Sequence, residues 1–169
     1  MTARLDPRVA DLVRDAGQRV REHEGGFTIS TSDVRKVVTD VEGTLSVEAI
    51  ERGVSNGFDL LTQSDDVLQR YVVTWVLNGW RSEQGLGFLP TAGTRQAPGY
   101  VVVDDGDAVT PDNQIRRLSD GVIVARRMAD VDAEALVVAL PHSLDDVLAA
   151  ARDRDGAPVW AKARRWLRR

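Results

Sequence analysis

The sequence predicts an α+β protein in which helices pack on a mostly antiparallel sheet of about six to seven strands. Segments rich in valine, isoleucine and threonine are separated by turn residues, as is typical of antiparallel strands. A long apolar helix divides these segments into two groups, and further helical patterns flank them at both ends of the chain. Because strands and helices come in groups and do not alternate one by one, a parallel sheet is not expected.

The composition predicts a single cytoplasmic domain. The 169 residues are 43% hydrophobic, which is enough for a core. Cysteine is absent, so disulfides, zinc thiolates and thiol nucleophiles are excluded. We find no signal-peptide pattern and no apolar run long enough to span a membrane. We expect one domain over residues 1–169, with an N-terminal helix in 1–25, a core in 26–160 and a basic tail in 161–169.

The first helix is expected at about residues 7–23. Asp6 is a typical N-cap, and Pro7 is suited to the first helical position. Apolar residues recur at helical spacing as far as Val20, and Gly25-Gly26 stops the pattern. Strands should follow at about 26–31, 34–41, 44–52 and 58–63.

A long buried helix should begin after Ser64 and run to about Glu83. Ser64 is a good cap, and Asp65 and Asp66 fall in the first turn, where the helix dipole favours acidic residues. The apolar residues of this segment cover more than one stripe, so the helix should be buried on more than one side. Gly85, just beyond it, is typical of a helix C-terminus.

More strands and two or three more helices should complete the fold. The clearest hairpin joins QIRRLS to VIVARRM through Asp120-Gly121, and GYVVVDD precedes it as a further strand. A helix is expected at about 130–140. Ser143 should cap another, LDDVLAAARDR, and the tail PVWAKARRWLRR has the pattern of a last amphipathic helix.

We assign no catalytic, cofactor-binding or metal-binding residue. The two histidines, His23 and His142, stand at ends of expected helices, where a structural role is favoured. The loop GLGFLPTAG lacks the Gly-Lys-Ser/Thr ending of a phosphate-binding loop and follows a helix instead of a strand. The acidic loop 104–112 lacks the glycine and glutamate of a calcium-binding loop, so we expect no metal there.

Charge divides the chain into an acidic body and a basic tail. The last eight residues, KARRWLRR, hold five of the 22 basic residues and none of the 26 acidic ones. An acidic body repels nucleic acid and membranes and suits a cationic protein partner, although ordinary solubility is the alternative explanation. Basic residues interleaved with tryptophan are typical of nucleic-acid or lipid contacts, but we favour docking of the tail on its own domain. We therefore expect no nucleic-acid partner and no membrane partner.

Three blocks of the chain are informative together: DDVLQRYVVTWVLNGWRSEQGLGFL, APGYVVVDDG and ALVVALPHSLDDVLAAARDRDGAPVW. The first has an acidic helix start, an Arg-Tyr pair and an arginine near the helix end. The second begins a strand with Pro-Gly-Tyr, and the third closes two helices with Asp-x-Asp-Gly-x-Pro. In this order and spacing, over about residues 26–160, they resemble the immunity-protein family typified by the immunity factor for tuberculosis necrotizing toxin. Pro141 departs from the family pattern, which tends to have serine there.

The resemblance implies a cytosolic antitoxin without catalytic residues or cofactors. Such a protein binds a secreted NAD glycohydrolase toxin one to one, blocks its NAD-binding pocket and so protects the producing cell. A pocket that holds a pyrophosphate should be electropositive, and an acidic inhibitor would be steered to it. The alternatives are a secretion chaperone or adaptor for an effector protein, and a small-molecule enzyme that uses a pair of carboxylates.

Two loops are candidates for the contact with the toxin, on physical grounds and not from the resemblance. Loop 104–112 is acidic and could mimic phosphates, and loop 90–99 is long enough to enter a cleft. For each loop the alternative is a plain connection between strands. The candidate partner-binding residues are Asp104, Asp105, Asp107, Asp112, Thr94, Arg95 and Gln96.

Overall fold

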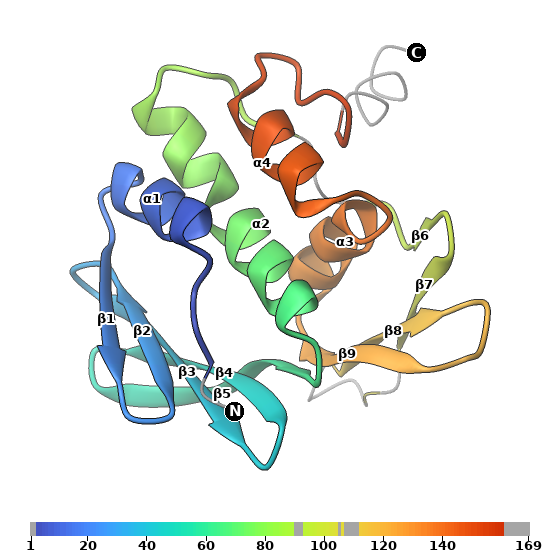
Figure 1. Ribbon diagram of the computed structural model, residues 1–169, viewed down its shortest axis with the longest axis horizontal. Helices are drawn as coiled ribbons and strands as arrows, with labels where there is room; N and C mark the ends of the chain where they lie inside the picture. Colours follow the sequence, from blue (N-terminus) through green and yellow to red (C-terminus); the bar gives the residue numbers. More distant parts are fainter. Residues whose placement is uncertain (1–2, 90–92, 105, 107–111, 161–169) are drawn as a thin grey trace.

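The computed structural model describes residues 3–89, 93–104, 106 and 112–160. Within these ranges, nine strands form one antiparallel sheet in the order β1-β2-β3-β4-β5-β9-β8-β7-β6, and four helices lie on one side of it (Figure 1). The predicted α+β class and antiparallel sheet are confirmed. The strand count exceeds the predicted six to seven, because β1 and the two-residue β6 extend the sheet at its two edges.

The bounds of the elements follow the chain order. The strands are β1 (Arg19–His23), β2 (Gly26–Ser30), β3 (Val34–Val41), β4 (Thr44–Glu51), β5 (Val54–Thr62), β6 (Gln96–Ala97), β7 (Tyr100–Asp104), β8 (Asn113–Arg117) and β9 (Ile123–Met128). The helices are α1 (Pro7–Asp15), α2 (Asp65–Glu83), α3 (Asp130–Ala139) and α4 (Leu144–Arg152). The tail helix expected in PVWAKARRWLRR lies outside the described residues from residue 161 on.

The N-terminal helix is shorter than predicted. A helix to residue 23 was expected, but α1 ends at Asp15 and residues 16–18 turn the chain into β1. Gly17 has a φ of +71° in this turn, a conformation that glycine adopts without steric cost. Val20 matched the helical spacing, yet it pairs with Ile29 across the β1–β2 hairpin. Pairing in the sheet therefore overrides the helical pattern here.

Strands β1 to β5 form a meander whose alternate side chains face the helices. Apart from Lys36 and its partners, the core on this face is mainly apolar from β2 to β5, and it continues across β7, β8 and β9. Its fully or almost fully buried strand residues include Phe27, Ile29, Val38, Val47, Leu60, Ile115 and Ala125. The four helices bury one face of the sheet, and no helix of the described residues covers the opposite face (Figure 1).

Helix α2 is the long buried helix that the sequence predicts. Ser64 Oγ accepts a hydrogen bond from the Val67 amide at 3.3 Å, so the predicted cap is confirmed. The helix contacts α1, α3 and α4 as well as β5, which explains why its apolar residues cover more than one stripe. Of the described helices, none is long and apolar enough to cross a membrane.

Two buried arginines of α2 hold the C-terminal helices. Arg70 is 5% exposed, and its Nε and Nη2 donate hydrogen bonds to the His142 carbonyl at the corner between α3 and α4, at 3.0 and 2.6 Å. Arg81 is fully buried. Its Nε donates to the Gly87 carbonyl at 2.8 Å, so it also holds the loop that leaves α2. One helix thus fixes both ends of α4.

The guanidinium of Arg81 is the centre of the contact with the end of α4. Nη1 donates to the carbonyls of Ala151 and Asp153 at 2.9 and 2.7 Å, and Nη2 donates to the Arg154 carbonyl at 2.8 Å. These carbonyls lie at a helix C-terminus, where no intrahelical donor remains for them. A permanently charged, forked donor is well suited to this cluster of acceptors.

The Asp-x-Asp-Gly-x-Pro segment closes this end of the molecule. Asp153 Oδ1 accepts hydrogen bonds from the amides of Ala157 and Asp155 at 2.9 and 2.8 Å, and these bonds lower the pKa of Asp153. Gly156 has a φ of +76°, and a Cβ there would lie 2.8 Å from both methyl carbons of Leu89. Glycine is therefore needed for this turn to pack on the loop after α2.

Replacing Arg81 by methionine should lower the free energy of unfolding by about 3 kcal/mol or more, because buried carbonyls lose their donor. Urea denaturation followed by circular dichroism measures this loss. The matched control is Arg154→Met, whose side chain is exposed; its effect should stay within about 0.5 kcal/mol. An equal loss in both variants would contradict the role given to Arg81.

Candidate functional site

The uncovered face of the sheet is the candidate functional surface. Phe58 pairs with Glu48, and Ile123 pairs with Arg116, on the side of the sheet that faces away from the buried core. Phe58 is 53% exposed and Ile123 is 44% exposed. Exposed apolar side chains on a face that no described helix covers make that face a candidate for contact with another molecule. The sequence analysis did not single out either residue, since only the strand register shows which way they point.

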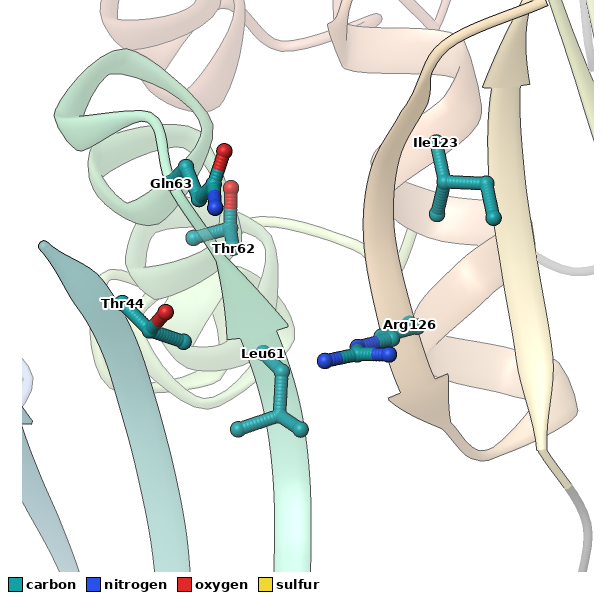
Figure 2. A pocket seen from close by; sticks show the side chains of 6 residues that line it. All are labelled: Thr44, Leu61, Thr62, Gln63, Ile123 and Arg126. Atoms are coloured by element: carbon teal, nitrogen blue, oxygen red, sulfur yellow. The ribbon is translucent and has the colours of Figure 1, made fainter.

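The two halves of the sheet meet at the junction between β5 and β9, where pairing is short. Leu61 pairs with Arg126, and Thr62 Oγ1 donates a hydrogen bond to the Val124 carbonyl at 2.7 Å. A pocket of about 240 Å³ opens at this junction, as Figure 2 shows. Its lining residues are Thr44, Leu61, Thr62, Gln63, Ile123 and Arg126.

The lining of the junction pocket favours binding over catalysis. Arg126 points toward Leu61 across the space between the two strands (Figure 2), and it forms no ion pair with any residue that the structure describes. Thr44 and Gln63 add a hydroxyl and an amide. The lining contains no histidine, carboxylate, lysine or cysteine that could act as a general base or activated nucleophile. An apolar or anionic group of a partner fits this chemistry.

A buried polar cluster lies on the other side of the sheet, under the helices. Lys36 is 6% exposed, and its Nζ donates to the Tyr71 hydroxyl at 2.9 Å and forms an ion pair with Asp59. The same Nζ lies 4.8 Å from the ring centroid of Trp75 and 5.3 Å from that of Tyr71, within the range of cation–π attraction. The cluster therefore joins β3, β5 and α2.

Burial shifts the pKa of Tyr71 and of the nearby Asp132. It raises the pKa of Tyr71 well above its usual range, with smaller contributions from the charges of Asp132 and Asp59. It also raises the pKa of Asp132, while the charge of Lys36 acts in the opposite direction. Tyr71 is 1% exposed and Lys36 6% exposed, so neither contacts solvent from which a substrate would arrive. The cluster is a structural element of the core.

Arg95, a predicted contact residue, is engaged within the chain. Its Nη1 forms an ion pair with Asp130 at 3.0 Å, and its Nη2 donates to the side chain of Asn113 at 2.9 Å. Asn113 is 1% exposed and donates in turn to the Met128 carbonyl at 3.0 Å. Arg95 therefore ties the loop after α2 to β8 and to the start of α3. Thr94 beside it is half-buried.

Of the acidic candidates, Asp112 is also held internally. Its Oδ1 accepts a hydrogen bond from the Arg127 amide at 2.8 Å, and its Oδ2 lies 3.5 Å from Arg127 Nε. Asp104, at the end of β7, and Gln96, in β6, are exposed. Asp105 and Asp107 lie outside the described residues. Among the described residues, no group of three or more histidines, cysteines or carboxylates is placed to hold a metal ion.

Comparison with known proteins places the chain among immunity proteins. The model of a family described as Immunity protein 61 matches residues 12–159, a longer span than the 26–160 of the sequence resemblance because it begins inside α1. The solved structure of Rv3902c from M. tuberculosis is similar, with a TM-score of 0.80 and 19% identity, and the match covers 95% of this chain and 97% of that chain. Identity at this level shows a common fold. No curated protein sequence matches the chain.

Replacing Lys36 by methionine should destabilise the protein by about 2 kcal/mol, because Asp59 and the Tyr71 hydroxyl lose their partner in a largely buried setting. Chemical denaturation measures the change. Arg35→Met is the matched control, since Arg35 is the next residue of β3 but is exposed; it should change stability by less than about 0.5 kcal/mol. A Lys36→Met variant as stable as the control would show that the cluster does not hold the fold.

Proposed function

The chain belongs to the Immunity protein 61 family, and on this basis we propose that it is an antitoxin that binds and inhibits a cognate secreted toxin. The toxin hydrolyses NAD, and the antitoxin blocks its NAD-binding site in a one-to-one complex in the cytoplasm of the producing cell. The match over residues 12–159 carries the immunity role. The NAD-hydrolysing chemistry of the toxin rests on the resemblance of the three sequence blocks.

The arrangement of the fold supports inhibition by occlusion. An inhibitor that blocks a site binds more tightly when its surface is already rigid, because no conformational entropy is then lost on ordering that surface. The sheet is fixed from its helical side by Lys36, and the helices are fixed by Arg70 and Arg81. The opposite face of the sheet and the exposed ends of β6 and β7 are then free to contact a partner.

The candidate contact residues divide into two roles. We propose that Asp104 and Gln96, both exposed, contact the toxin together with Thr94, Asp105 and Asp107. Arg95 and Asp112 support the contact indirectly, because their side chains hold the neighbouring strands in place through the bonds described above. In this proposal, carboxylates at the end of β7 meet the electropositive NAD pocket of the toxin.

The deciding experiment titrates the protein into the toxin domain encoded beside its gene while NAD hydrolysis is measured. We expect activity to fall to zero at a one-to-one ratio. Binding seen by calorimetry with undiminished hydrolysis would instead identify a secretion chaperone or adaptor. Absence of both binding and inhibition would contradict the proposed function for this toxin.

Reversing the charge of Asp104, Asp105 and Asp107 to lysine should slow association with the toxin by about tenfold or more, because electrostatic steering acts mainly on the association rate. Stopped-flow mixing at low salt measures the rate. The matched control reverses Glu24, Glu42 and Glu83, which are exposed elsewhere and change the net charge equally. Equal association rates for the two triple variants would show that the end of β7 does not contact the toxin.

A further inference from the structure

Four arginines line a groove near the β1 edge of the sheet, far in the strand order from β7 and its exposed Asp104. The groove has a volume of about 570 Å³ and lies where the turn after α1 meets the first three strands. Its lining contains no carboxylate. The lining residues with charged or polar side chains are Arg14, Arg19, Arg21, Arg35, Gln18, Thr28 and Ser30.

The strand register explains why the three strand arginines, Arg19, Arg21 and Arg35, face the same way. Ser30 of β2 pairs with Arg19 of β1 on one side and with Arg35 of β3 on the other. Arg19 and Arg35 are therefore two strand spacings apart, roughly 10 Å, on one face of the sheet. Arg21 follows two residues along β1 and points to that face as well. The next residue after Arg35 is Lys36, which points to the core and is buried.

Most of this positive charge has no counter-charge within the described chain. Arg14 forms an ion pair with Asp11 at 2.8 Å. Arg19, Arg21 and Arg35 are exposed and form no ion pair with any described residue. Like charges roughly 10 Å apart or closer repel one another at low ionic strength. The cluster stands out in a chain whose net charge is −4, and an anionic partner would relieve the repulsion.

The position of the groove beside an edge strand indicates which class of anionic molecule it binds. β1 is the edge of the sheet, and no described strand pairs with its outer side (Figure 1). An edge strand offers backbone donors and acceptors to an added extended chain. Side chains of such a chain recur on one face every roughly 7 Å, close to the spacing of Arg19 and Arg21. Guanidinium groups bind carboxylates with two parallel hydrogen bonds.

We infer that this arginine groove is a docking site for an extended acidic segment of a protein partner. The identification of that partner as the toxin rests on the proposed function. Nucleic acid fits less well, because Asp11, which pairs with Arg14, adds negative charge beside the groove and the chain as a whole is acidic. In the toxin complex, the positively charged groove is a second contact. It lies near the opposite edge of the sheet from the first contact, the negatively charged end of β7.

A peptide titration tests the groove without the toxin. Hexaglutamate added to the ¹⁵N-labelled full chain should shift the signals of β1, the end of β2 and the start of β3. Its affinity should fall by about tenfold between low and moderate salt, since exposed charges are screened. The Arg19→Glu/Arg21→Glu/Arg35→Glu variant should lose the binding. The control variant Arg4→Glu/Arg52→Glu/Arg154→Glu, at exposed positions elsewhere, should keep it.

Three outcomes of the titration overturn the inference. They are an absence of shifts, shifts that both triple variants lose equally, and binding of inorganic phosphate or duplex DNA to the groove as tightly as the peptide. The toxin assay is separate. If the wild-type protein inhibits the toxin but both triple variants associate at the same rate, the groove does not anchor the toxin. If the wild-type protein neither binds nor inhibits it, the proposed function fails while the peptide result still decides the nature of the groove.

Discussion

The fold depends on two arginines that project from one helix into groups of backbone carbonyls. Arg70 and Arg81 of α2 are almost completely buried, and they reach the two ends of α4. A buried guanidinium is tolerated only where acceptors satisfy its donors. The carbonyls that bind Arg81 lie at the C-terminus of α4, where intrahelical donors are lacking. The His142 carbonyl that binds Arg70 lies in the corner between α3 and α4. The buried guanidinium groups and the backbone carbonyls therefore satisfy each other's hydrogen bonds. These bonds hold the helices in one arrangement.

This constraint gives a physical reason for the sequence block that resembles the immunity-protein family. The Arg-Tyr pair contains Arg70, which holds the α3–α4 corner, and Tyr71, which hydrogen-bonds Lys36 under the sheet. The arginine near the helix end is Arg81, and its acceptors include residues of the Asp-x-Asp-Gly-x-Pro segment in the third block. The blocks are therefore parts of one internal network. Their order and spacing identify the fold because they make these internal contacts.

Charge is separated across the sheet in a way that the net charge conceals. Asp104 is exposed at the end of β7, while arginines that form no ion pair with any described residue lie together on β1 and β3. Between them, the junction pocket carries the single cation Arg126 among its lining residues. An antitoxin with this distribution would recognise a toxin through two contacts of opposite sign. Such a pairing favours one orientation of the complex over others, because a reversed orientation would bring like charges together.

The sequence by itself determined the elements whose signals are local. Caps, turn glycines and apolar periodicity were enough for α2, α4 and the β8–β9 hairpin, because these depend on residues close in the chain. Tertiary structure decided the rest. Val20 has the spacing of a helix but lies in β1, since pairing with β2 outweighs local preference. Arg95 and Asp112 look like contact residues in the sequence, yet their partners come from segments at least 15 residues away. Only the register across three strands brings Arg19, Arg21 and Arg35 to one face, because pairing between strands is a non-local property that spacing along the chain does not report.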